Sequence, residues 1–70
     1  MADLKVLMRA LHERRYIHFM DSSGMERSGI VCRITWDDME DICTIKTSTN
    51  DHITIPIEKL HVLRVGLRAT

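Results

Sequence analysis

The sequence predicts an α+β protein, mainly β, in which one N-terminal helix precedes a strongly bent, five-stranded antiparallel sheet. Apolar residues recur with the 3.6-residue period of a helix over the first fifteen positions, and then with the two-residue period of strands. The 70 residues suffice for one small domain, residues 1–70, and 44% hydrophobic with 29% charged residues is typical of a globular chain. Because so small a domain buries a modest core, an oligomer or a partner is expected to help stabilise it.

The helix is expected over about residues 3–14. Four apolar residues at helical spacing form its inward stripe, namely Leu4, Leu7, Met8 and Leu11. Asp3 stands where an N-cap side chain can accept hydrogen bonds from the free N–H groups of the first turn. Arg14 and Arg15 favour an end there, because cations interact favourably with the C-terminal end of a helix.

Five short strands follow, separated by turn-forming residues. They are expected at residues 16–20, 26–36, 42–47, 52–57 and 61–65. Gly29 is expected to bend the long second strand, so that it serves two halves of a small barrel. A helix packed on such a sheet is the Sm-like or SH3-like arrangement, in which closure reduces the exposed edges. The barrel is expected over about residues 16–65, with residues 66–70 as a frayed tail.

The alternation of apolar and polar residues along the strands predicts which side chains form the core. On the second strand, Ile30, Cys32, Ile34 and Trp36 share one face, opposite Val31 and Arg33. The full predicted core is Leu4, Leu7, Leu11, Ile17, Phe19, Ile30, Cys32, Ile34, Ile45, Ile53, Ile55, Ile57, Leu60 and Leu63. Cys43 is also expected to face inward, so both thiols are interpreted as inert packing.

Charge, hydropathy and cysteine content argue against several classes of protein. Ten Lys and Arg balance ten Asp and Glu, whereas a free-standing nucleic-acid-binding protein usually has a positive excess. No run approaches the ~20 apolar residues of a membrane span, and the first residues do not resemble a signal peptide. Two cysteines without a CxxC motif suggest free thiols rather than a zinc site. We therefore expect a cytoplasmic protein.

No group of residues in the sequence points to catalysis or to a metal. The four histidines lack ligand spacing, and the acidic run 37–41 lacks the alternating pattern of a calcium loop. There is no Ser/His/Asp arrangement and no glycine-rich phosphate loop. The expectation is a protein that is not an enzyme and holds neither metal nor cofactor.

The distribution of charge favours binding. Arg9, Arg14 and Arg15 cluster at the helix and its exit, whereas the acidic residues cluster in the run 37–41. Opposite patches suit complementary or head-to-tail docking, because they steer association and fix its register. Two separately solvated surfaces would give the same pattern.

Two residues on the second strand each allow two interpretations. Trp36 either closes the barrel or is an exposed anchor beside the acidic loop, of the kind that dominates interfaces. Arg33 either pairs across the sheet or marks an exposed working face with Tyr16, His18 and Lys46. Exposed methionines in the turns, Met25 and Met39, would add adaptable apolar surface.

Three segments in order carry a family resemblance. The glycine-led strand Gly29–Ile34 is followed by the acidic turn, by Ile42–Ile45 and by Ile55–Leu60. This layout resembles the YolD-like family of small bacterial and phage proteins, with Ile57 in place of the family's Phe. The resemblance covers roughly residues 4–64. It implies an accessory protein, associated with Y-family DNA polymerases and phage or plasmid genes, that acts by protein contact.

The layout is also similar to the WYL domain, an Sm-like module of bacterial regulators. In that domain a helix ending in Glu-Arg-Arg precedes a strand, as Glu13–Arg15 precedes Tyr16–Phe19 here. The Trp-Tyr-Leu signature is absent, so the ligand contacts of that domain are not carried over. A looser similarity to the RNA chaperone Hfq, in the strand after Gly29, implies a ring-forming RNA-binding protein. Two extra residues precede the acidic turn, and the uridine-pocket motif has no match.

The sequence therefore favours a small, non-enzymatic binding module that acts as an adaptor or inhibitor through protein contact. A homo-oligomer is expected, with a DNA-repair or regulatory protein as partner. The residues expected to make the contact are Arg14, Arg15, Arg33, Trp36, Asp37, Asp38 and Met39. One alternative is an Sm-like nucleic-acid-binding ring, which requires Arg9, Arg14, Arg15 and Arg33 to share one face for phosphate contacts. Another is a small-molecule sensor.

Overall fold

Helix α1 (Leu4–Glu13) opens the computed structural model, which describes residues 4–69. Its buried residues are Leu7 and Ala10, which lie three positions apart on one face. Met8, expected on that face, is instead 54% exposed, and Ala10 takes the inward position. The expected N-cap, Asp3, lies outside the described residues.

The helix ends at Glu13 because the next residue adopts a left-handed backbone. Arg14 has a φ of 56°, and its N–H donates to the carbonyl of Leu11 at 3.3 Å. This is a common way to satisfy the free carbonyls of a last turn, although glycine is the usual residue there.

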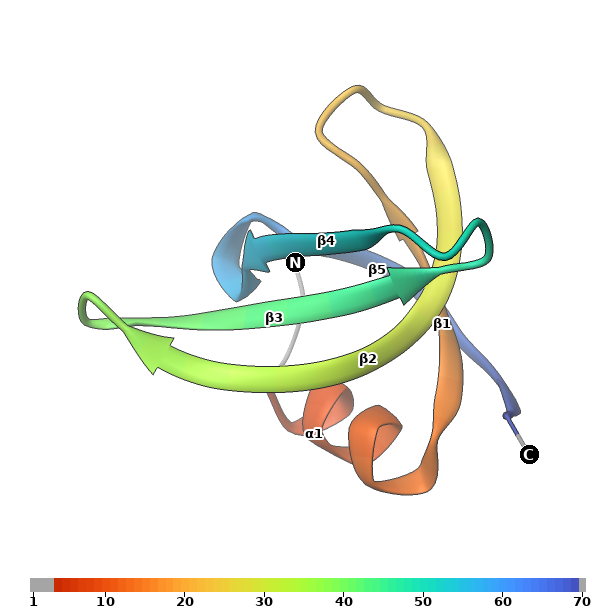
Figure 1. The fold of residues 1–70 in the computed structure, drawn as a ribbon, viewed down its shortest axis with the longest axis horizontal. Coiled ribbons are helices and arrows are strands. Elements are labelled where there is room, and N and C mark those ends of the chain that lie inside the picture. The colour runs from red at the N-terminus through yellow and green to blue at the C-terminus, as the bar shows by residue number, and fades with distance from the viewer. Residues whose placement is uncertain (1–3, 70) are drawn as a thin grey trace.

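Five strands and one 3₁₀ turn follow the helix (Figure 1). Their bounds are β1 (Arg15–Met20), β2 (Glu26–Asp37), β3 (Glu40–Thr47), β4 (His52–Pro56), η1 (Ile57–Lys59) and β5 (His61–Arg68). All neighbouring strands are antiparallel, in the order β4-β3-β2-β1-β5. The prediction of one helix and a five-stranded antiparallel sheet is confirmed. The sheet is open, with β4 and β5 at its edges, and β2 is strongly curved (Figure 1).

A β-bulge in β2 changes which side chains enter the core. The β2–β3 register shifts between Val31 and Arg33, so Cys32 is an extra residue. Val31 is therefore 2% exposed, whereas Cys32 is exposed and Ile30 faces outward. The prediction that Ile30 and Cys32 face the core was therefore wrong. Ile34 follows the bulge and packs against the core as predicted.

Gly29 lies where β2 and β3 approach each other closely, and the bulge of β2 falls three residues later, at Cys32. A Cβ at this position would lie 2.5 Å from the backbone oxygen of Lys46 and 2.7 Å from Cγ2 of Ile45. β2 and β3 approach so closely here that only glycine fits without a shift.

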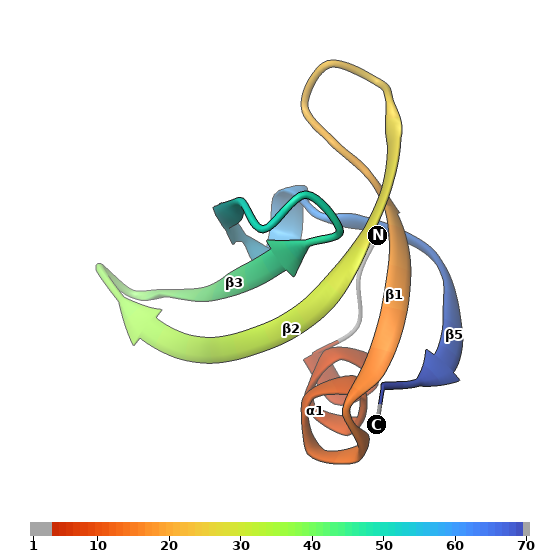
Figure 2. The ribbon, with the colours of Figure 1, turned by 45° about the vertical axis from the view of Figure 1, so that its right-hand side comes forward.

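The last strand is longer than predicted. β5 continues through Arg68, where the sequence suggested a frayed tail from residue 66. Arg68 is the register partner of Arg15 in β1, and the N–H of Ala69 donates to the carbonyl of Arg14. Figure 2 shows the end of β5 close to α1. A register shift in this pair makes Val62 partly buried and leaves Leu63 40% exposed, which corrects its place in the predicted core.

The core joins the helix to one face of the sheet and to η1. Its buried members are Leu7, Ala10, Ile17, Phe19, Val31, Cys43, Ile45, Ile57 and Leu60. Burial raises the pKa of the Cys43 thiol to about 11, as expected for an inert packing residue. The core therefore fixes the sheet as a rigid support for the loops at its ends.

Candidate functional site

Four of the expected contact residues lie together at the tip of the β2–β3 hairpin. Trp36 and Asp37 end β2, and Asp38 and Met39 form the two-residue turn before β3. The tip projects at one end of the longest axis of the molecule (Figure 1). Trp36 is 68% exposed and Met39 is 85% exposed. Trp36 is therefore an exposed residue beside the acidic loop and does not close a barrel.

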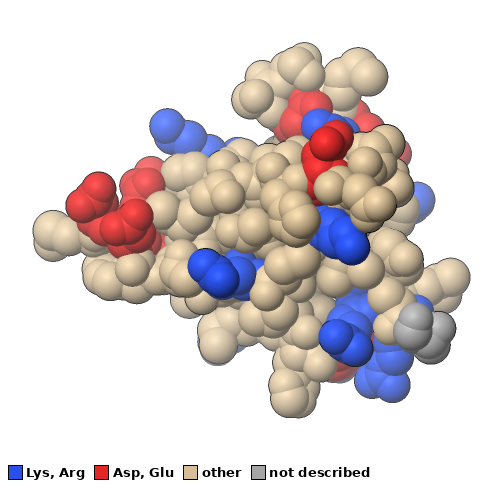
Figure 3. Space-filling view, in the orientation of Figure 1, with Lys and Arg blue, Asp and Glu red and all other residues tan. Residues whose placement is uncertain are grey.

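The tip is also strongly acidic. Asp37 pairs with Glu40 and Trp36 with Asp41 across the hairpin, and Asp38 lies in the turn, so this short segment carries four carboxylates beside two apolar side chains. Figure 3 shows acidic atoms gathered at this end of the molecule. None of the tip carboxylates forms an ion pair with another side chain in the part of the chain that the structure describes. Their charge is therefore available to a binding partner.

The backbone of the turn is unusual for its residues. Asp38 and Met39 have φ values of 47° and 66°, the pattern of a type I′ turn, which suits the twist of a two-residue hairpin. Asp is accepted at the first position, but the second strongly prefers glycine. A left-handed conformation costs an L-residue about 1–2 kcal/mol. Met39 thus places a large apolar side chain at the tip despite backbone strain.

Arginines gather at the other end of the molecule, where α1 meets β1 and β5. Glu13 lies between two of them: Arg9 Nε is 2.7 Å from its Oε2, and Arg15 Nε is 2.7 Å from its Oε1. Arg68 donates from Nε to the backbone carbonyl of Glu13 at 3.1 Å, and Arg14 is exposed beside them. Hydrogen bonds from Arg15 and then Arg9 lower the pKa of Glu13 to about 2. Two arginines thus bind the carboxylate of Glu13, and Arg14 and Arg68 lie beside its backbone, which leaves this end positive (Figure 3).

A groove lies beside these arginines, between α1 and β5. It has a volume of about 330 Å³ and is lined by Val6, Arg9, Ala10, Arg15 and Val65. Val6 and Val65 are 37% and 41% exposed, so the groove presents apolar surface next to cations. The sequence did not predict this groove. The last strand was expected to end at Val65, and Val6 is not part of the apolar stripe predicted for the helix.

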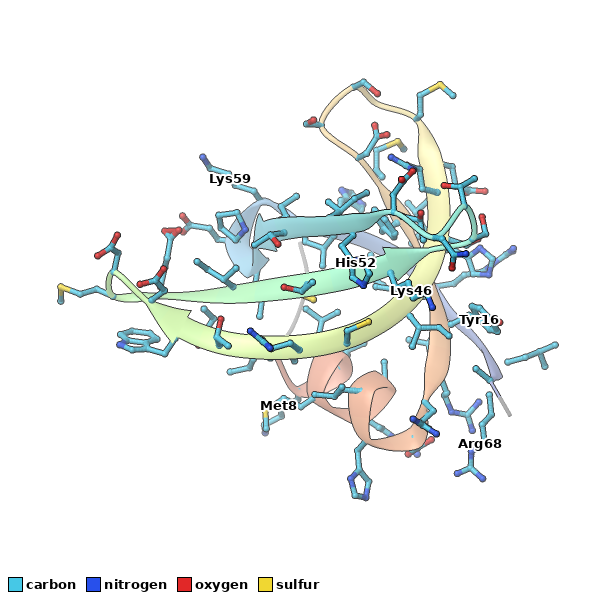
Figure 4. The ribbon with its side chains drawn as sticks, viewed as in Figure 1. Met8, Tyr16, Lys46, His52, Lys59 and Arg68 are labelled. Carbon is cyan, nitrogen blue, oxygen red and sulfur yellow. The ribbon has the colours of Figure 1, made fainter. Side chains whose placement is uncertain are left out.

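The outer face of the sheet is separate from both ends. Tyr16, Ile30, Lys46 and His52 are successive register partners across β1, β2, β3 and β4. Figure 4 shows Lys46 close to His52, with Tyr16 further along the same side of the sheet. Arg33 pairs with Thr44, two residues from Lys46, and so shares this face. The register therefore places Arg33 on the same face as Tyr16, His18 and Lys46, the four residues that its second interpretation groups together.

The arginines of the predicted contact set do not form one patch. Arg15 has the strand parity of the buried Ile17, which places it on the inner side of the sheet. Arg33 lies on the outer side. The structure thus separates Arg33 from Arg14 and Arg15, and separates all three from the tip.

Within residues 4–69 no group of three or more His, Cys, Asp and Glu side chains is placed to hold a metal ion. Cys32 is exposed, contrary to its expected burial, because it is the bulged residue. Over the same range no helix has the length and apolar character needed to cross a membrane.

Comparison of the chain with protein-family models, with curated proteins and with solved structures finds no match. The functional argument therefore depends on the geometry of the surfaces described above.

Proposed function

We propose that this chain is a non-enzymatic protein-binding module whose contact element is the tip of the β2–β3 hairpin. The observation that supports it is the exposure of Trp36 and Met39 at a hairpin tip that also carries four carboxylates. Tryptophan is enriched among the residues that contribute most binding energy, whereas acidic side chains around it steer a basic partner. The partner surface therefore has an apolar pocket bordered by Lys or Arg.

The strained turn supports the same proposal. Replacing Met39 with glycine would relieve the left-handed backbone, yet the position carries the most exposed large apolar side chain of the described residues. Strained residues that persist in a fold are concentrated at functional sites. The side chain of Met39 adapts readily to the shape of a partner, which suits a contact residue.

The wider role follows from the same surface. The curvature of β2 and the strand order support a small Sm-like or SH3-like barrel, a scaffold that presents hairpin tips on a rigid core. With the resemblance to YolD-like and WYL proteins, this favours a bacterial or phage accessory protein that acts as an adaptor or inhibitor of a DNA-repair or regulatory protein. Its site of action would be the cytoplasm.

A capture experiment tests the proposal. The tagged protein is used to capture partners from an extract of the cells that produce it, and the same is done with Trp36→Ala/Asp38→Lys. The matched control is Met25→Ala/Glu26→Lys, which removes an exposed apolar side chain and reverses a charge at the β1–β2 hairpin. We expect a partner that is lost with the first variant and kept with the second. Equal capture by both variants would contradict the proposal.

Trp36 also provides a direct measurement, because it is the only tryptophan in the sequence. Its fluorescence emission should shift to shorter wavelength when a captured, purified partner is added, since the indole then leaves water. No shift at saturating partner would exclude the tip as the contact.

Nucleic-acid binding on the outer face of the sheet is the second candidate. The row from Tyr16 through Lys46 to His52, with Arg33 nearby, combines one stacking ring with cations. Affinity for a single-stranded oligonucleotide should then fall steeply with salt and fall again in Lys46→Glu. A flat salt dependence would eliminate this candidate.

A further inference from the structure

The two ends of the molecule are complementary to each other. One end, the tip, carries four carboxylates together with the exposed side chains of Trp36 and Met39. The other carries four arginines and one carboxylate, beside the groove lined by Val6 and Val65. Each end thus has apolar surface bordered by charge, and the two charges are of opposite sign (Figure 3).

The complementarity cannot be satisfied within one chain. The tip lies at one end of the long axis, which spans 32 Å, and Arg68 is labelled at the opposite side of the molecule in Figure 4. The core holds both on one rigid sheet, because β2 carries the tip while β1 and β5 carry the arginines. The tip can therefore reach such a groove only on another molecule.

We propose that copies of this chain assemble head to tail, with the β2–β3 tip of one copy docked in the α1–β5 groove of the next. The inference rests on the proposed function of the tip and names a second copy as its partner. The indole of Trp36 meets Val6 and Val65 between the guanidinium groups of Arg9 and Arg15, an arrangement that adds cation–π attraction to apolar burial. The carboxylates of the tip meet Arg14 and Arg68 at the rim.

Charge complementarity between the two ends supports a second copy as the partner. The whole chain has ten cationic and ten anionic side chains, so it has no net attraction to a polyanion or a polycation. Its separated ends nevertheless attract each other in a head-to-tail orientation and repel in a head-to-head one. Because the two contacting surfaces differ, the assembly is heterologous and forms an open chain or a closed ring.

The test uses two variants that each disable one end. Trp36→Ala/Asp38→Lys disables the tip, and Val6→Glu places a carboxylate in the groove where it repels the tip. Met8→Glu is the control, because Met8 is exposed on the same helix and does not line the groove. Molar mass is measured by light scattering and sedimentation from micromolar to millimolar protein, at low and at high salt.

The wild type and Met8→Glu should increase in mass with concentration and return to monomer at about 1 M salt, where screening acts over ~3 Å. Each end variant should stay monomeric alone. An equimolar mixture of the two should form a 1:1 dimer and nothing larger, because only one intact tip and one intact groove meet.

Three results would overturn the assembly: a monomeric wild type at low salt, undiminished association of either end variant, or a mixture that stays monomeric. Undiminished association would point to another interface, such as the free edges of β4 and β5. The proposed function is judged separately by the capture experiment. A monomeric protein that still loses a captured partner when Trp36 and Asp38 are changed would keep the function and exclude self-assembly.

Discussion

Arg68 donates a hydrogen bond from Nε to the backbone carbonyl of Glu13 at 3.1 Å, and so attaches the end of the chain to the end of the helix. These residues are separated by 55 positions in sequence. The contact satisfies one of the carbonyls that the last helical turn leaves free. It also places Arg68 at the positive end of the molecule, where the sequence suggested a frayed tail.

Arg68→Ala should lower the free energy of unfolding by about 0.5–1.5 kcal/mol, the usual net value of one hydrogen bond. It should also speed hydrogen exchange at the N–H of Ala69, which pairs with Arg14. Arg64→Ala is the control, since Arg64 lies on the same strand and is exposed. Equal effects of the two changes would show that this hydrogen bond does not hold β5 in place.

Gly29→Ala should destabilise the fold by about 1–3 kcal/mol, because the new Cβ overlaps the backbone of β3 at Lys46. Gly66→Ala is a graded comparison, since its Cβ would lie 3.2 Å from the end of the His18 side chain, which can move. Urea unfolding of both variants measures the difference. If Gly66→Ala were the more harmful change, the close approach of β2 and β3 would not explain Gly29.

Met39→Gly should raise the free energy of unfolding by roughly 0.5–1 kcal/mol, because glycine accepts a φ of 66° with little strain. The same change should weaken partner binding through loss of the exposed side chain. Asn50→Gly, at a φ of 67° in the β3–β4 turn, is the control, because it changes neither the tip nor the arginines. A Met39→Gly variant that binds as well as wild type would show that the side chain has no contact role.

Stability should fall on acidification between about pH 4.5 and pH 2 as Glu13 is protonated. Arg15 and Arg9 lower the pKa of Glu13 in the folded state from 4.5 to about 2. The unfolded state therefore binds the proton first, so the stabilising contribution is complete above pH 4.5 and is lost as the pH falls towards 2.

Urea unfolding across this range, compared with Glu13→Gln, measures the contribution of Glu13. Part of the acid sensitivity should persist in that variant, because hydrogen bonds from Ser23 and Met25 also lower the pKa of Asp21. Identical pH profiles for wild type and Glu13→Gln would contradict the prediction.

One thiol should react with an alkylating reagent in the folded protein and two in urea. Cys32 is exposed at the bulge, whereas Cys43 is buried and its pKa is raised to about 11. Reaction depends on the thiolate and on access, so Cys43 should be protected for as long as the fold persists. Cys32→Ser should abolish the fast reaction, and a fast reaction that survives this change would place Cys43 at the surface.

The sequence by itself determined the elements that depend on local pattern. The helix, the number of strands and the acidic turn after Trp36 follow from periodicity and turn chemistry, because these act between residues close in the chain. The same local signals indicated that Leu7, Ile17, Phe19 and Ile45 would be buried.

Only the tertiary structure decided which side of β2 enters the core, how far β5 extends and what lies beside α1. The bulge at Cys32 turns Val31 inward, and the pairing of Arg68 with Arg15 continues β5 past Val65. Both depend on the register between strands, where a shift of one residue exchanges the faces. The groove between Val6 and Val65 exists for the same reason, since it joins residues 59 positions apart that meet only when β5 pairs with β1.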